Sequence, residues 1–129
     1  MGYKVAVVGA TGNVGREVLT TLSERSFPAD DVVALASERS AGLEISYGDA
    51  KDLKVQNLET FDFKGVDIVL SSPGASVSAI HAPRAAKAGA VVIDNTSQFR
   101  MDEDVPLIVP EVNGHMIHEY GKRNIIAHP

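Results

Sequence analysis

The sequence predicts a Rossmann-like α/β domain, a doubly wound, mainly parallel sheet with helices on both faces. Short β-branched runs alternate along the chain with helical patterns, as in proteins whose parallel strands are covered on both sides. A glycine-rich turn follows the first such run and precedes the first helical pattern. With 129 residues, of which 44% are apolar and 22% charged, residues 1–129 are expected to form a single domain with its own core.

The first strand is predicted at Tyr3 to Val8, where the sequence YKVAVV is almost continuously apolar and β-branched. Apolar residues between positions 14 and 22 then recur at helical spacing over about three turns. Ser26-Phe27-Pro28 ends this helix. Asp31 to Ser37 predicts a second strand, and alternating apolar residues between 42 and 59 predict a small hairpin.

The middle of the chain predicts a second strand–helix–strand unit. Asp67 to Ser71 has the sequence of a buried strand. Ala75 to Ala88 is rich in alanine and helical in pattern, and Pro83 either kinks this helix or starts a second one. Gly89 is the predicted C-cap, and Ala90 to Asp94 is the next strand.

The last third predicts shorter elements. Leu107 to Val109 is a candidate strand, Asn113 to Lys122 is a candidate helix with Asn113 as its N-cap, and Asn124 to His128 begins a final strand. The sequence stops two residues after Ile125-Ile126-Ala127, which has the pattern of a buried strand. Because natural termini usually continue into exposed polar sequence, we expect the chain to be a fragment of a longer protein.

The composition excludes several classes of site. The absence of cysteine excludes a disulfide framework, a thiolate zinc site and a thiol nucleophile within this chain. A net charge of −5 argues against a nucleic-acid partner but permits a local cationic pocket. No apolar run could span a bilayer and no signal peptide is evident, so we expect a cytoplasmic protein without a membrane partner. His115 and His118 form an incomplete ligand set, so no metal is expected.

The glycine turn is a variant of the dinucleotide-binding fingerprint. Residues 9–15 have the sequence GATGNVG, between the first strand and the first helix. Gly9 permits the tight turn, Gly12 lets the backbone approach a pyrophosphate, and Gly15 lets helix and strand pack closely. The helix N-terminus adds unpaired N–H groups and a positive dipole end. A nucleotide-binding P-loop is excluded because no Gly-Lys-Ser/Thr follows.

The end of the second predicted strand indicates which dinucleotide binds. An acidic residue there would hold the 2′-hydroxyl of NAD, whereas an arginine suits the 2′-phosphate of NADP. The sequence is Ser37-Glu38-Arg39-Ser40. Glu38 could serve NAD, but one planar guanidinium between two nearby hydroxyls favours NADP.

Three segments, at 9–15, 36–42 and 92–113, closely resemble the N-terminal domain of the aspartate-β-semialdehyde dehydrogenases, and the similarity extends from Tyr3 to Pro129. In that family the complete enzyme uses NADPH to reduce aspartyl phosphate to the semialdehyde and releases phosphate. The product is a precursor for lysine, threonine and methionine biosynthesis, and the lysine branch passes through diaminopimelate. The resemblance implies an oxidoreductase that acts as a homodimer in its full-length form.

The resemblance also implies roles for individual residues. Those expected to bind NADP are Gly9, Thr11, Gly12, Asn13, Val14, Ser37, Arg39, Ser40, Ser71 and Gly74. Thr11 to Val14 are expected at the pyrophosphate, the three residues from 37 to 40 at the 2′-phosphate, and the last two near the nicotinamide, while Gly9 forms the turn of the same loop. Arg100, with Asn95, is expected to bind the substrate's phosphate. From the residues alone, a surface side chain paired with the acidic run at 102–104 is the better interpretation of Arg100.

One departure from the family pattern limits what the chain can do. The family's nucleophile is a cysteine just beyond a segment like Asn124 to Pro129, and its catalytic histidine and substrate-carboxylate arginine lie in the next domain. We therefore expect no catalytic residue and no activity in this chain. Two rival functions remain: an N-acetylglutamyl-phosphate reductase, and a non-catalytic NADP-sensing module.

Overall fold

The computed structural model describes residues 2–48, 52–113, 121 and 123–129. Its centre is a six-stranded sheet whose neighbouring strands are all parallel, in the order β5-β2-β1-β6-β7-β8. The strands are β1 (Tyr3–Val8), β2 (Ala29–Ala36), β5 (Gln56–Asn57), β6 (Ile68–Ser71), β7 (Val91–Asp94) and β8 (Ile125–Ala127). Counted along the chain, this is the 3-2-1-4-5-6 order of dinucleotide-binding folds, and the predicted fold class is confirmed.

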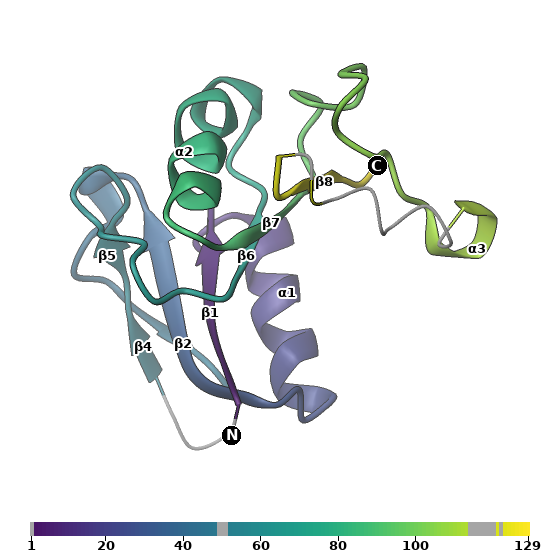
Figure 1. Ribbon diagram of the computed structural model, residues 1–129. Helices are drawn as coiled ribbons and strands as arrows, with labels where there is room; N and C mark the ends of the chain where they lie inside the picture. The colour runs from purple at the N-terminus through teal and green to yellow at the C-terminus, as the bar shows by residue number, and fades with distance from the viewer. Residues whose placement is uncertain (1, 49–51, 114–120, 122) are drawn as a thin grey trace.

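Two helices cover opposite faces of the sheet (Figure 1). They are α1 (Asn13–Glu24) and α2 (Ala75–Lys87). Successive residues of β1 serve the two faces in turn: Val5 and Val7 pack in the core beneath α1, whereas Ala6 and Val8 pack in the core beneath α2. This double burial explains why β1 is apolar at nearly every position.

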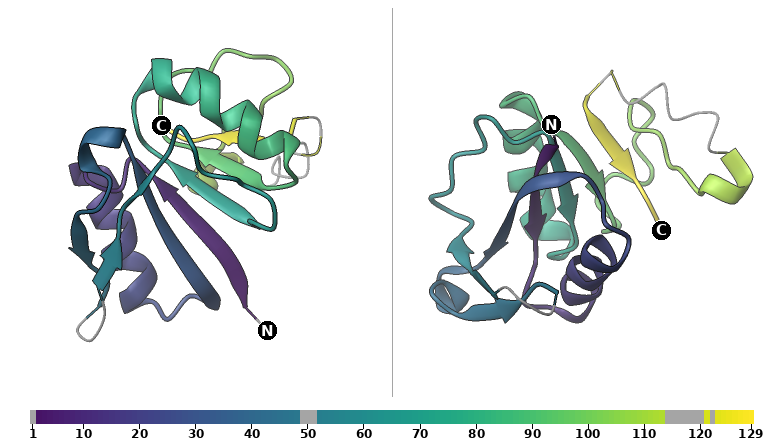
Figure 2. Two further views of the ribbon diagram at one scale, coloured as in Figure 1. Left: turned by 90° about the vertical axis from the view of Figure 1, so that its left-hand side faces the viewer. Right: turned by 90° about the horizontal axis from the view of Figure 1, so that it is seen from below.

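A small antiparallel hairpin, β3 (Glu44–Ser46) and β4 (Asp52–Lys54), lies on the α1 side of the sheet (Figure 2). Ile45 and Leu53, which pair across the hairpin, join the core that contains Leu19 of α1. The predicted hairpin is therefore confirmed. The two-residue strand β5, which pairs with the end of β2, was not predicted because Gln56 and Asn57 lack an apolar pattern.

The two helices end largely as the sequence predicts. α1 ends at Glu24, and Ser26 adopts a left-handed φ of 50° just before Phe27-Pro28. α2 continues through Pro83 as one helix, so this proline does not start a second helix. Gly89 follows the C-cap residue with a φ of 108°, a conformation that favours glycine.

Several strand and helix ends differ from prediction by one or two residues, and three elements differ more clearly. β2 starts two residues early and ends at Ala36, so Ser37 instead precedes a short 3-10 turn, η1 (Glu38–Ser40). Leu107 forms only an isolated parallel bridge to Ala127, so no strand forms at 107–109. Proline rather than asparagine begins the next helix, α3 (Pro110–Asn113).

Asn113 is thus not the predicted N-cap. It lies at the end of α3, where its side chain accepts from the Val109 N–H at 2.7 Å and donates to the Leu107 carbonyl at 2.7 Å. Most of the helix predicted at 113–122 lies outside the described residues. Figures 1 and 2 both show α3 projecting away from the sheet. Within the described ranges, no helix combines the length and hydrophobicity needed to cross a membrane.

Candidate dinucleotide-binding site

The centre of the site is the point where the chain changes direction across the sheet. β1 and β6 are neighbours, but the chain continues from β1 to β2 on one side and from β6 to β7 on the other. Ligands of open α/β sheets bind in the crevice that such a divergence leaves at the carboxyl ends of the strands. Here the loops after β1 and β6 meet: the Ser72 N–H donates to the Val8 carbonyl at 3.0 Å.

Gly9 and Gly15 are required by the protein's own geometry. Gly9 has a φ of 82°, and its N–H donates to the Leu35 carbonyl of β2 at 2.9 Å. A Cβ at Gly15 would lie 2.1 Å from the Gly9 carbonyl oxygen, inside the backbone of the preceding turn. These two glycines therefore allow the sharp turn and the close approach of α1 to β1, as the sequence predicts.

Gly12 is different, because nothing in the described part of the chain requires a glycine there. Its φ of −79° is open to any residue, and an added Cβ would meet only the Gly9 carbonyl oxygen, at an ordinary 3.5 Å. The space beside it is thus left open by the fold, on the cavity side of the loop. This is the geometry expected where a ligand approaches the backbone, and it fits a pyrophosphate.

The N-terminus of α1 adds an electrostatic component to the same place. Gly12 is its N-cap and supplies no side-chain cap, and the first turn contains no acidic residue. The first N–H groups and the positive end of the helix dipole are therefore available to an anion. The site combines this helix end with an open glycine backbone.

The larger cavity at this edge has a volume of about 650 Å³. Five segments enclose it: the glycine loop, the turn η1 after β2, the turn after β5, the loop after β6, and the first turn of α2. The lining residues are Gly9, Thr11, Gly12, Ala36, Ser37, Glu38, Arg39, Leu58, Glu59, Ser72, Pro73 and Val77. It thus brings the glycine loop together with Arg39, whose side chain is exposed at the end of β2.

A second cavity, of about 280 Å³, lies on the other side of the loop after β6. It is lined by Val14, Val18, Leu70, Ser71, Ser72, Ile93, Asn95 and His128. Ser72 borders both cavities, so one elongated ligand could extend from the first into the second. The structure therefore groups Val14, Ser71 and Asn95 here, separately from Arg39.

The remaining predicted residues lie close by but outside these two cavities. Asn13 lines an adjoining apolar groove on α1, and the Ser40 N–H donates to the Ser37 carbonyl at 2.9 Å within η1. Gly74 adopts a φ of 109° immediately before α2 and serves as its N-cap.

Arg100 lies at the carboxyl ends of β7 and β8. Its Nη2 donates to the Asn95 carbonyl at 2.8 Å and to the His128 carbonyl at 3.4 Å, while its buried Nε has no hydrogen-bond partner among the described residues. The acidic run pairs elsewhere: Asp102 and Asp104 lie 3.1 and 3.3 Å from Arg123 Nη1. The alternative in which Arg100 neutralises that run is therefore wrong.

A fully buried carboxylate fixes the turn that presents Asn95 and Arg100. Asp94 Oδ2 accepts from Ser78 Oγ of α2 at 2.5 Å, and Oδ1 accepts from the Thr96 N–H at 2.8 Å. Buried carboxylates need such donors, because leaving one unsatisfied is costly. Asp94 thus ties α2 to the segment that starts after β7.

Several lining residues were not predicted from the sequence, notably Leu58, Glu59 and His128. Each follows a strand that ends at the ligand-binding edge, so recognising β5 as part of the sheet would have placed Leu58 and Glu59 here. No metal-ligand cluster occurs in the part of the chain that the structure describes. His115 and His118 lie outside it.

Residues 4–120 match the family model described as the NAD-binding domain of semialdehyde dehydrogenase. The chain belongs to this family. The resemblance drawn from the sequence is thereby confirmed, and membership assigns a nicotinamide dinucleotide to the domain.

Similar proteins agree with this assignment. Aspartate-semialdehyde dehydrogenase of Aquifex aeolicus is 53% identical over 130 residues, which cover 100% of this chain and 38% of that protein. The crystal structure of aspartate semialdehyde dehydrogenase II from Vibrio cholerae, complexed with ASA, gives a TM-score of 0.96 at 53% identity over 100% of this chain and 42% of that one. The chain thus spans only 38–42% of these relatives' length.

A more distant structure includes a bound cofactor. Aspartate semialdehyde dehydrogenase with NADP from Candida albicans gives a TM-score of 0.73 at 28% identity, covering 98% of this chain and 42% of that one. The match supports a nicotinamide cofactor for this fold, and the choice between NAD and NADP depends on the residues at the end of β2.

Replacing the two glycines one at a time should separate folding from binding. Gly15→Ala places a Cβ 2.1 Å from a carbonyl oxygen, so we expect a loss of about 1–3 kcal/mol or more in the free energy of unfolding. Gly12→Ala should change that free energy by less than about 1 kcal/mol, yet weaken NADPH binding about tenfold or more. Urea unfolding and calorimetric titration measure the two effects. Equal destabilisation by both changes would contradict the assignment of Gly12 to the cofactor.

Proposed function

We propose that this chain is the NADP-binding domain of an aspartate-semialdehyde dehydrogenase. The observation that carries the proposal is that Arg39 lines the same cavity as the open backbone of Gly12. A dinucleotide with its pyrophosphate at Gly12 and the N-terminus of α1 would place its adenosine ribose at the end of β2. Arg39 is there to meet a 2′-phosphate, and Ser37 and Ser40 add nearby hydroxyl groups.

The chemistry divides between this domain and the rest of the protein. The nicotinamide ring, when bound, accepts or donates the hydride. This domain's residues would hold the phosphates and direct the nicotinamide half past Ser72 toward the smaller cavity with Ser71 and Asn95. Arg100, at the carboxyl ends of β7 and β8, would hold the substrate's phosphate beside it. The full-length protein would act as a homodimer on aspartyl phosphate.

The relatives favour this activity over the rival acyl-phosphate reductase, because proteins about 50% identical to the chain are aspartate-semialdehyde dehydrogenases. A stand-alone sensor would need no phosphate-binding arginine beside the nicotinamide end. The Asp94 network, which builds a turn that presents Arg100, supports a reductase for the same reason.

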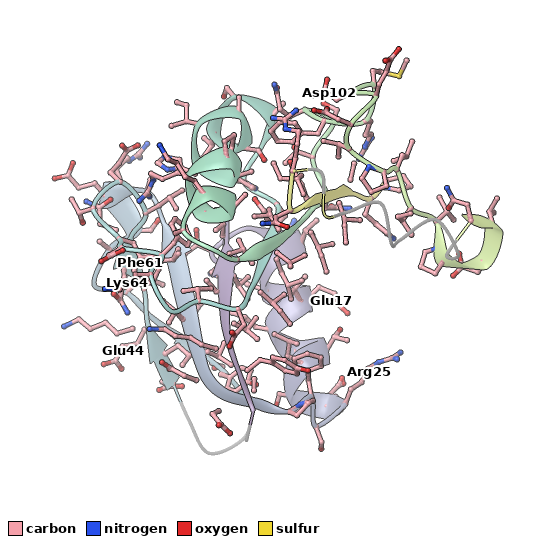
Figure 3. The ribbon with its side chains drawn as sticks, in the orientation of Figure 1. Glu17, Arg25, Glu44, Phe61, Lys64 and Asp102 are labelled. Atoms are coloured by element: carbon pink, nitrogen blue, oxygen red, sulfur yellow. The ribbon has the colours of Figure 1, made fainter. Side chains whose placement is uncertain are left out.

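Arg39 should determine cofactor choice. A charge-assisted hydrogen bond contributes about 1.5–3 kcal/mol, so Arg39→Ala should weaken NADPH roughly tenfold or more and leave NADH nearly unchanged. Calorimetric titration of the chain with each cofactor measures this. Arg25→Ala, at the far end of α1 and labelled in Figure 3, is the matched control. Equal losses for both cofactors would show that Arg39 acts through folding.

Arg100 should affect phosphate and not cofactor. In the full-length protein, Arg100→Leu should raise KM for phosphate or acyl phosphate about tenfold or more, and KM for NADP far less. Arg123→Leu, which removes the arginine paired with Asp102 and Asp104, is the control. If both KM values rise together in the Arg100 variant, this residue supports the fold and does not bind phosphate.

The 129-residue chain alone should bind NADPH but show no turnover. Acyl-phosphate reduction of this kind proceeds through a thioester, and the sequence contains no cysteine to form it. The assay is phosphate-dependent NADP reduction with aspartate semialdehyde, using protein free of host enzyme. Turnover that increases with the concentration of this chain would refute the requirement for a nucleophile outside it.

A further inference from the structure

The turn after β5 forms one wall of the larger cavity. Leu58 and Glu59 of this turn line the cavity together with residues of the glycine loop. The Leu58 N–H extends the sheet by donating to the Ala36 carbonyl at 2.8 Å, and the Glu59 N–H donates to Asn57 Oδ1 at 3.0 Å. Two longer hydrogen bonds lie within the turn, from the Thr60 N–H to the Asn57 carbonyl at 3.3 Å and from the Phe61 N–H to the Leu58 carbonyl at 3.4 Å. The shorter contacts to its carbonyls come from α2.

Arg84 of α2 binds both ends of this turn. Its Nη2 donates to the Leu58 carbonyl at 2.7 Å and its Nη1 to the Phe61 carbonyl at 2.6 Å. The guanidinium lies 4.8 Å from the centre of the Phe63 ring, which packs edge-on against Phe61 (labelled in Figure 3). A planar guanidinium with donors at fixed positions is well suited to joining two backbone carbonyls.

His81, one turn earlier on α2, connects Arg84 to the cavity. Its ring is 5% exposed, with Nδ1 3.2 Å from Arg84 Nη2 and Nε2 3.5 Å from Glu59 Oε1. Because arginine can only donate, Nδ1 must accept, and the ring proton therefore lies on Nε2, facing the Glu59 carboxylate. His81 thus orients both Arg84, which holds the turn, and Glu59, which lines the cavity.

The position of this turn indicates which part of the ligand it meets. With the pyrophosphate at α1 and the ribose at the end of β2, the base lies beyond β2, on the side of β5. The first turn of α2 also reaches the cavity, through Val77. α2 therefore positions two walls of the space left for the adenine: the turn after β5, which Arg84 holds, and the first turn of α2 itself.

We propose that Arg84 and His81 are positioning residues for the adenine side of the cofactor cavity. They hold the turn at 57–61 in its binding geometry before the ligand arrives, so that the cofactor does not have to order it. The inference rests on the proposed function, since it assumes that an adenine dinucleotide occupies the cavity. Because ordering even one backbone residue corresponds to about a tenfold change in affinity, the effect should be measurable.

The test uses adenosine 2′,5′-bisphosphate, which contains the adenine and the 2′-phosphate but no nicotinamide. Calorimetric titrations of the 129-residue chain compare Arg84→Met, His81→Leu and His81→Gln with wild type, alongside thermal melts. Glutamine can accept with its carbonyl and donate with its amide, so it mimics the neutral ring with its proton on Nε2. Lys87→Met, an exposed change at the end of the same helix, is the control.

We expect Arg84→Met to weaken binding of the bisphosphate about tenfold. Binding of NADPH should weaken by the same factor, because the substitution does not change the nicotinamide side of the site. His81→Leu should weaken it several-fold, whereas His81→Gln and Lys87→Met should bind like wild type. If Arg84→Met does not fold, the two His81 variants decide.

Two results would overturn the inference: unchanged binding by folded Arg84→Met, or equal losses in His81→Leu and His81→Gln. Wild-type chain that binds neither ligand would refute the proposed function itself, and the inference with it. The two failures are therefore distinguishable, because one appears in the wild type and the other only in the variants.

Discussion

The structure depends on the close approach of α1 to β1. Gly15 lies so near the Gly9 carbonyl oxygen that no side chain could be accommodated, and α1, which follows β1 in the chain, starts at the carboxyl edge of the sheet. This contact directs the first N–H groups of α1 toward the space beside Gly12. The anion site is thus a consequence of how the first strand–helix unit packs, and the cavities form around it where the chain diverges between β1 and β6.

α2 organises the rest of the site through polar side chains. Ser78 donates to the buried Asp94 carboxylate, which holds the turn carrying Asn95 and Arg100. On another side of the same helix, Arg84 and His81 hold the turn that borders the larger cavity. α1 therefore provides the anion site, whereas α2 positions both flanking loops. The loop that contains Ser72, which borders both cavities, leads directly into α2.

The sequence predicted the parts of the fold that local patterns specify. β1, which is buried on both faces, the glycine turn, and the ends of α1 and α2 shortly before Ser26 and Gly89 each depend on residues close in sequence. β5 could not be predicted, because it consists of two polar residues that form a strand only by pairing with the end of β2. The role of Asn113 could not be predicted either, because its side chain bonds to the backbone N–H of Val109 and the backbone carbonyl of Leu107. The contacts of His81 and Arg84 likewise become apparent only when α2 packs beside the turn after β5.

The most direct test of the account is where the cofactor binds on the surface of the sheet. A ¹⁵N-labelled sample of the chain, titrated with NADPH, reports this through its backbone amide signals. If the cofactor binds at the glycine loop and the end of β2, the largest shifts fall on residues 11–15 and 37–40, at the carboxyl edge. The amide signals of Gly65 and Gly89, which lie in turns that precede β6 and β7 at the opposite edge, should not shift. Shifts confined to those turns, with the glycine loop unaffected, would contradict the account.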